Sequence, residues 1–116
     1  DAVAVFDADG NFLQAFGAAY RGGAHGLALR EEAGVEYLYL TDVTRHVVAK
    51  LGLDGTVLWE FQTNRPFETV NGVTAKGGSI NGPGPTVVGG TLFVASGYSY
   101  LGMGMSGNVL LAFRPE

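Results

Sequence analysis

The chain contains no cysteine, which excludes disulfides, a thiolate nucleophile and cysteine-ligated metals or clusters. Charged residues make up only 16% of its 116 residues, and the seven Lys and Arg are scattered along a chain of net charge −4. Without a basic patch, binding to the phosphate backbone of a nucleic acid is not expected. Apolar runs are short and interrupted by glycine, so we also expect no membrane insertion.

Glycine, by contrast, is abundant. Nineteen residues are Gly, roughly twice the average usage, which favours many tight turns between short strands. No long segment shows a helical apolar period, and 47% of the residues are apolar, so we predict one globular all-β unit. The chain opens on an acidic residue inside a predicted strand, from which we expect a soluble protein with no signal peptide in this chain.

A strand pair repeats after about 45 residues, a period typical of one β-propeller blade. Residues 9–16 (DGNFLQAF) align with residues 54–61 (DGTVLWEF), and an apolar strand precedes each copy. In both copies an Asp-Gly pair separates two alternating segments, which is a strong hairpin signal. The repeat therefore predicts blades of four antiparallel strands.

The predicted strands form one complete blade over residues 25–61, with an incomplete blade on each side. The expected strands are residues 2–7, 11–16, 25–30, 36–41, 46–53, 57–61, 86–88, 92–95 and 108–113. Residues 62–85 are polar and rich in glycine, and we expect a long loop there, which is usually functional or disordered.

About two blades per chain cannot close a ring, and open strand edges invite pairing with another chain. The N-terminal hairpin (residues 2–16) could complete the last blade within one chain. We favour instead closure by oligomerisation or strand exchange between copies, so the predicted partner is the chain itself, as a homo-oligomer.

Residues 1–61 resemble the NHL-repeat propellers, and three segments carry this resemblance. They are residues 24–29 (AHGLAL), 37–42 (YLYLTD) and 45–50 (RHVVAK).

Residues 55–116 are similar to the PQQ-type quinoprotein propellers, the group of alcohol and polyvinyl-alcohol dehydrogenases. The segments that carry this second resemblance are residues 55–61 (GTVLWEF), 77–85 (GGSINGPGP), 96–98 (SGY) and 107–113 (GNVLLAF). It is the more specific of the two, because it extends through a long loop that propensity alone would not dictate.

Together the resemblances imply a chimera of an NHL-like region (residues 1–61) and a quinoprotein-like region (residues 62–116) that form one cooperative unit. We expect a non-catalytic propeller module that acts as a structural, self-assembling or binding scaffold of unknown ligand, as a recombined or engineered fragment. Two alternatives stay open. One is a fragment of a PQQ-dependent alcohol dehydrogenase, which would use PQQ with calcium; the other is a zinc-binding NHL-type propeller. The families are often periplasmic or secreted.

His25 begins a predicted inner strand, where side chains point toward the propeller axis. Its Ala-His-Gly-Leu setting is similar to that of zinc-ligating histidines in the NHL-like peptide-amidating lyases. A catalytic zinc needs three protein ligands, so His25 would bind metal only if several chains shared the site. The alternative is a histidine bonded to neighbouring backbone.

Other acidic and histidine residues are interpreted as parts of turns. His46 and Asp42 could form an acid–base pair, but we predict that Asp42 instead accepts backbone N–H groups in the turn before residues 46–53. Asp7 and Asp9 faintly resemble a calcium loop, yet the distal bidentate Glu is missing and an Asp-Gly turn is preferred.

Trp59 and Phe61 are expected to pack between adjacent blades, as a quinoprotein docking tryptophan does, and Phe16 is the repeat equivalent of Phe61. In residues 77–85 backbone N–H groups could hold an anion, but we predict a structural bend. The apolar residues 98–105 could cover a ligand or pack between chains. The residues that define the structural blade signature are Asp9, Gly10, Asp42, Asp54, Gly55, Trp59 and Phe61.

Overall fold

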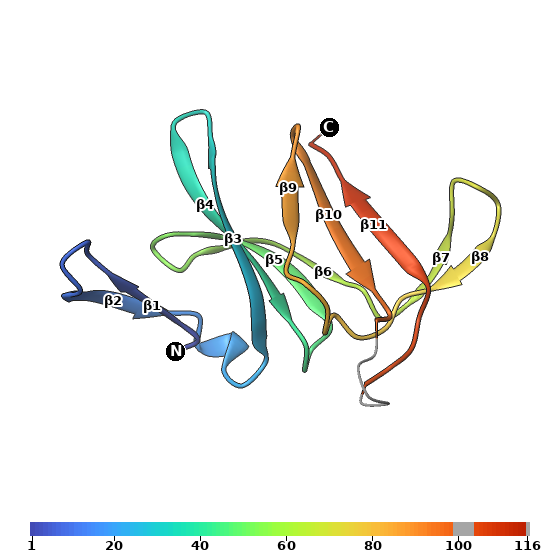
Figure 1. Ribbon diagram of the computed structural model, residues 1–116, viewed down its shortest axis with the longest axis horizontal. Helices are drawn as coiled ribbons and strands as arrows, with labels where there is room; N and C mark the ends of the chain where they lie inside the picture. Colours follow the sequence, from blue (N-terminus) through green and yellow to red (C-terminus); the bar gives the residue numbers. More distant parts are fainter. Residues whose placement is uncertain (99–103, 116) are drawn as a thin grey trace.

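The computed structural model describes residues 1–98 and 104–115, and these residues are almost entirely β-structure (Figure 1). Within these residues the one helical element is the short 3-10 helix η1 (Ala18–Tyr20). The strands are β1 (Val3–Phe6), β2 (Phe12–Phe16), β3 (Ala24–Glu32), β4 (Val35–Asp42), β5 (Val47–Gly52), β6 (Val57–Gln62), β7 (Pro66–Glu68), β8 (Thr74–Lys76), β9 (Thr86–Val88), β10 (Thr91–Ser96) and β11 (Val109–Phe113). The prediction of an all-β fold is confirmed.

A complete four-stranded antiparallel sheet, in the order β3-β4-β5-β6, forms the centre of the molecule. Its central strands follow the alternation of the sequence, because successive side chains of a strand point to opposite faces. Leu38 and Leu40 lie on one face, whereas Tyr39 lies on the other. Both faces are therefore apolar, as a blade between two neighbours requires.

Two separate hydrophobic clusters cover these two faces. The first joins Phe16 and Tyr20 to the leucines of β4 and to β5, with Val3 and Val5 of β1 packed against it. The second joins Tyr39 and Val48 to β10 and to Ile80. Figure 1 shows the resulting arrangement, in which the β1-β2 hairpin and the sheet of β9, β10 and β11 flank the central sheet.

The flanking sheets hold fewer strands than the central one. β1 and β2 form a two-stranded sheet, and the other sheet has the order β11-β10-β9, so β11 is an edge strand among the described residues. β1 and β2 pair with each other and not with β11, so the hairpin does not complete the last sheet within the chain.

The prediction of a long loop over residues 62–85 is wrong in one respect. The segment contains a short hairpin, in which β7 pairs with β8 and Phe67 lies opposite Ala75. The hairpin could not be recognised from the sequence, because strands of three residues are too short to show an alternating pattern among polar and glycine residues. Ala75 is buried and Phe67 stacks on Phe61 at a centroid distance of 6.1 Å, so the hairpin is held by tertiary contacts and not by β-propensity.

Candidate functional site

The interface between the central sheet and β11 is built from aromatic side chains. The Phe113 ring centroid lies 4.9 Å from those of Trp59 and Phe61, in edge-to-face geometry with each. Arg65 extends over the Phe61 ring at 5.2 Å. The expected packing of Trp59 and Phe61 between sheets is what the geometry shows, and Phe16 is buried in the same way against the other face.

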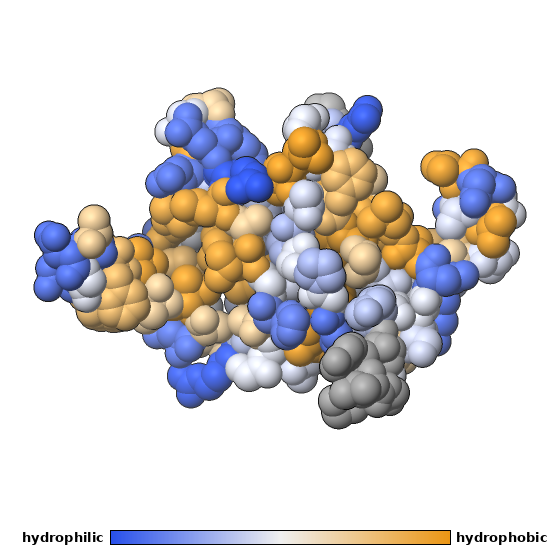
Figure 2. Space-filling model, in the orientation of Figure 1, coloured by the Kyte–Doolittle hydropathy of each residue, from blue (hydrophilic) through white to orange (hydrophobic). Residues whose placement is uncertain are grey.

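A cleft of about 610 Å³ opens beside this aromatic interface, between the central sheet and the sheet of β9, β10 and β11. Its walls include Trp59, Leu92 and Phe113, and its rims are the end of β3 and the β9-β10 turn. The notch between the β3-β4 hairpin and the β9-β10 hairpin is visible at the upper edge of Figure 2. A volume of this size is in the range of sites for small molecules.

One end of the cleft carries a coupled group of polar side chains. The Lys50 ammonium lies 2.5 Å from a Glu32 carboxylate oxygen and 4.0 Å from the centre of the Tyr37 ring. The Tyr39 hydroxyl donates a hydrogen bond to the same Glu32 carboxylate. Lys50 is the one charged residue of β5, and it interrupts an otherwise apolar strand.

The ionisation of this group follows from its pairing. Burial would raise the pKa of Glu32, but hydrogen bonds from Lys50 and Tyr39 outweigh it and the pKa is lowered. Burial and the bond to Glu32 raise the pKa of Tyr39. Burial would lower the pKa of Lys50, but Glu32 and Tyr39 together outweigh it and the pKa is raised. Near neutral pH the group is a carboxylate, an ammonium and a neutral phenol.

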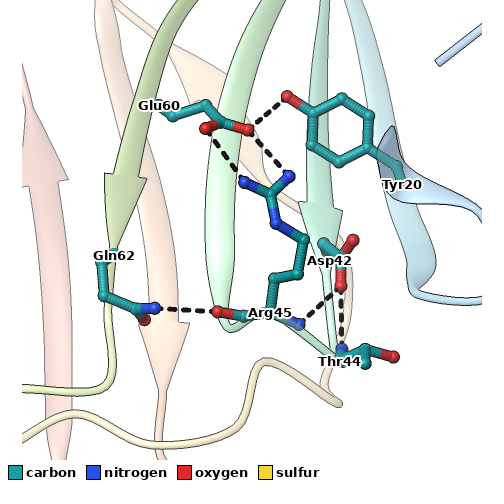
Figure 3. A network of polar contacts seen from close by, with 6 residues as sticks. All are labelled: Tyr20, Asp42, Thr44, Arg45, Glu60 and Gln62. Atoms are coloured by element: carbon teal, nitrogen blue, oxygen red, sulfur yellow. Dashed lines mark hydrogen bonds and ion pairs between the residues drawn. The ribbon is translucent and has the colours of Figure 1, made fainter. Parts of the chain in front are cut away.

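A second polar network lies on the opposite face of the central sheet, beneath η1 (Figure 3). The Tyr20 hydroxyl donates to Glu60 at 2.5 Å, and the Arg45 guanidinium binds both oxygens of the same carboxylate at 3.1 and 3.2 Å. Burial and, as the second cause, the hydrogen bond to Glu60 raise the pKa of Tyr20 to about 12. Burial opposes ionisation of Glu60, yet Tyr20 and Arg45 together lower its pKa.

The predicted role of Asp42 is observed. Its buried carboxylate accepts hydrogen bonds from the backbone N–H groups of Thr44 and Arg45, both at 2.8 Å (Figure 3). His46 follows this turn with a positive φ of 56°. Its Nδ1 is buried and has no hydrogen-bond partner. The carboxylate of Asp42 is thus committed to the turn and not to a histidine.

The Asp-Gly turns also have the expected geometry. Gly10 and Gly55 occupy equivalent positions with φ of 86° and 88°, a conformation that favours glycine. The Asp7 carboxylate accepts from the backbone N–H groups of Asp9 and Asn11, and Asp54 accepts from Thr56 N–H. These contacts make Asp7 and Asp54 turn residues.

Residues 77–80 of the Gly-rich segment 77–85 are buried. The backbone N–H groups of Gly77, Gly78 and Ser79 all donate to protein oxygens, at 2.9, 2.9 and 2.8 Å respectively. These three donors are therefore unavailable to an anion, which supports the predicted bend. The apolar loop 98–105 is described only at residues 98, 104 and 105, so the interpretation of that loop falls mainly outside the described residues.

His25 is an exposed residue on β3, the edge strand of the central sheet. Among residues 1–98 and 104–115, no three His, Cys, Asp or Glu residues come together as a metal-ion site. The same described residues include no helix with the length and apolarity needed to cross a membrane. Zinc binding by His25 between copies stays a prediction.

Sequence reasoning missed both polar networks. A signal was present, because Lys50 and Glu60 each place a charge in a strand of apolar and aromatic neighbours. The partners could not be found in this way, since Glu32 lies 18 residues from Lys50 and Tyr20 lies 40 residues from Glu60.

The fold and its contacts define a module of stacked antiparallel sheets that join through aromatic residues, as consecutive propeller blades do. Two curated proteins, both named polyvinylalcohol dehydrogenase, are similar to this chain. The protein from Pseudomonas sp is 47% identical over 71 residues, which covers 54% of this chain and 11% of the relative. The protein from Sphingopyxis sp. (strain 113P3) is 35% identical over 71 residues, again 11% of its length.

The chain therefore spans about a tenth of the length of these curated relatives. No family model matches the chain, and no solved structure matches it. The similarity supports the quinoprotein-like part of the sequence interpretation. The NHL resemblance and the chimera stay predictions.

Proposed function

We propose that this chain is a non-catalytic β-propeller segment, a scaffold whose unfinished end sheets dock further blades, supplied by copies of the chain itself. The observation that carries this proposal is the contrast between its sheets. Within the described residues, the central sheet is covered on both faces, whereas the sheet of β9, β10 and β11 is covered on one. Each end of the stack thus presents a surface that a neighbouring blade would bury.

The uncovered face of the last sheet is apolar. Leu111 points to the central sheet and is buried, while its neighbour Leu110 is 67% exposed. Val88 on β9 is also exposed, and Phe93 lies beside it in the sheet on the same side by register. At the other end of the molecule, Phe12 is 61% exposed. Exposed apolar patches of this kind mark interaction surfaces.

The free edge of β11 is the place where a strand of a second copy would pair. β11 pairs with β10 along one side only, and an unpaired edge offers a row of N–H and C=O groups to an incoming strand. A blade of four strands needs one more strand there. The β2 strand of a second copy is the repeat equivalent of β6, which fills this position in the central sheet.

The experiment is to measure the mass of the assembly by native mass spectrometry and sedimentation velocity. We expect an oligomer, and we expect Leu110→Arg to shift it toward monomer. Val70→Arg is the matched control, because Val70 is fully exposed in the connection between β7 and β8 and belongs to neither end sheet. A monomer at all concentrations, or equal effects of the two variants, would overturn the proposal.

A second candidate function is a segment of a PQQ-dependent alcohol dehydrogenase, favoured by the 47% identity to a polyvinylalcohol dehydrogenase. The residues present do not fit the complete cofactor site, because the described part of the chain supplies no cluster of acidic or histidine donors for calcium. PQQ added with calcium should then give no bound quinone absorbance after desalting. A retained quinone spectrum would favour this candidate over the scaffold.

A further inference from the structure

The cleft between the central sheet and the sheet of β9, β10 and β11 has a charge opposite to that of the whole chain. Its lining holds three basic side chains, Arg30, Lys50 and Arg114, and two acidic ones, Glu31 and Glu32. The chain as a whole has a net charge of −4. The lining of this cleft therefore carries one more basic than acidic side chain.

The three basic side chains differ in their ion-pair and hydrogen-bond partners. Lys50 is neutralised by Glu32. Arg30 donates to the carbonyl oxygens of Leu29 and Val87 at 2.6 and 3.3 Å. Arg114 donates through Nε to the Thr91 hydroxyl at 3.2 Å. Hydrogen bonds to neutral oxygens leave a guanidinium charge uncompensated.

Neither arginine of the cleft forms an ion pair with an acidic side chain of residues 1–98 and 104–115. Arg114 bonds to Thr91 through Nε, and its two terminal nitrogens form no hydrogen bond or ion pair with residues 1–98 or 104–115. A planar guanidinium matches the two oxygens of a carboxylate, and such charge-assisted pairs are the stronger hydrogen bonds of proteins.

The rest of the cleft is apolar. Trp59 and Phe113 are half-buried and meet edge to face, while Leu92 is buried behind them. The rim on one side is the β9-β10 turn, in which Gly89 and Gly90 have φ of 56° and 70° and open space where side chains would lie. The mouth of the cleft is accordingly not closed by side chains of this turn.

We propose that this cleft binds a small organic carboxylate with an apolar or aromatic body. The body would lie against Trp59 and Phe113, and the carboxylate would pair with Arg114, with Arg30 adding charge. The combination of an apolar wall with a few placed polar groups is the usual composition of a small-molecule site. The site is lined by residues of one chain, and Val88 of β9 belongs both to its lining and to the exposed face described above.

The test uses Trp59, because it is the only tryptophan of the chain and lines the cleft. The probe is 4-phenylbutyrate, titrated while tryptophan emission is followed with excitation at a wavelength that the probe does not absorb. The comparison is 4-phenylbutyramide, which has the same body without the charge. We expect the acid to bind saturably. We expect the amide to bind at least about tenfold more weakly, because it lacks the charge-assisted contact.

The protein variant is Arg114→Gln, and the matched control is Arg21→Gln, which removes the same charge from an exposed residue next to η1. We expect the acid to bind about tenfold more weakly to Arg114→Gln and unchanged to Arg21→Gln. Equal binding of acid and amide by the unaltered protein would overturn the proposal even if Arg114→Gln did not fold. Equal binding of the acid by the two variants would overturn it as well.

Discussion

The Trp59 ring on β6 meets the Phe113 ring on β11 edge to face, with centroids 4.9 Å apart and an interplanar angle of 71°. The two residues are far apart in sequence and belong to different sheets. Their contact joins the second cluster of the core to the wall of the cleft. The same pair thus links the stability of the sheet stack to the only small-molecule site that we propose.

Replacing Phe113 by Leu and Trp59 by Leu should show that the two rings are energetically coupled. We expect each single variant to lose about 1 to 3 kcal/mol of unfolding free energy, and the double variant to lose less than the sum by about 0.5 to 1.5 kcal/mol. Urea denaturation followed by circular dichroism measures all four proteins. Val70→Ala is the control, because Val70 is fully exposed, and it should change stability by less than about 0.5 kcal/mol. Strict additivity would show that the edge-to-face contact contributes nothing.

Asp42 and Asp54 provide a matched comparison of two turn carboxylates. Both accept backbone N–H groups, but Asp42 is buried and binds two of them, whereas Asp54 is exposed and binds one. Asp42→Ala should therefore cost about 2 to 3 kcal/mol, since two backbone N–H groups lose a charged, buried acceptor, and Asp54→Ala about 1 kcal/mol or less. Thermal and urea unfolding of both variants test this. Similar losses would mean that burial of the turn does not matter.

The β3-β4 turn contains a strained alanine. Ala33 and Gly34 both have positive φ, 51° and 80°, as a two-residue type I′ hairpin requires. Ala33→Gly should stabilise the protein by up to about 1 kcal/mol, because only glycine adopts this conformation without cost. Gly34→Ala should destabilise it by a similar amount, since its surroundings are open and only the backbone conformation opposes the methyl group. The measurement is the urea midpoint of each variant compared with that of the unaltered protein. An Ala33→Gly variant less stable than the unaltered protein would contradict the assigned turn.

The repeated hairpins could be predicted because their signals are local. The Asp-Gly pairs at Gly10 and Gly55 and the alternation of residues 57–61 each fall within one hairpin, and the strands observed there agree with the expected ones to within about two residues. Three-residue strands such as β7 carry no periodic signal, so the hairpin with β8 was missed. Its position depends on the stacking of Phe67 on Phe61.

The candidate site was largely beyond sequence reasoning for the same reason. Trp59 could be expected at the interface from the quinoprotein resemblance, but its partner Phe113 depends on how two sheets pack. The Glu32–Lys50 pair joins the end of β3 to β5 across β4. Such a contact depends on sheet register, which a single sequence does not specify without the fold.

Tyr20 and Glu60 should make stability fall in alkaline solution. The pKa of Tyr20 is raised from an ordinary value of 10.0 to about 12 in the folded chain. The phenol keeps its proton more tightly when folded, so its contribution is fully present below pH 10.0 and is lost as pH rises toward 12. We expect a loss on the order of 1 to 2 kcal/mol over this window. Tyr39 and Lys50 also have raised pKa values and add to the alkaline loss.

The measurement is therefore the difference in stability between the unaltered protein and Tyr20→Phe, from urea midpoints at pH 8 to 12. The variant should be less stable at pH 8, because the Glu60 carboxylate loses a donor, and the two curves should converge as pH rises. Parallel curves would show that the Tyr20 hydroxyl and Glu60 are not coupled in solution.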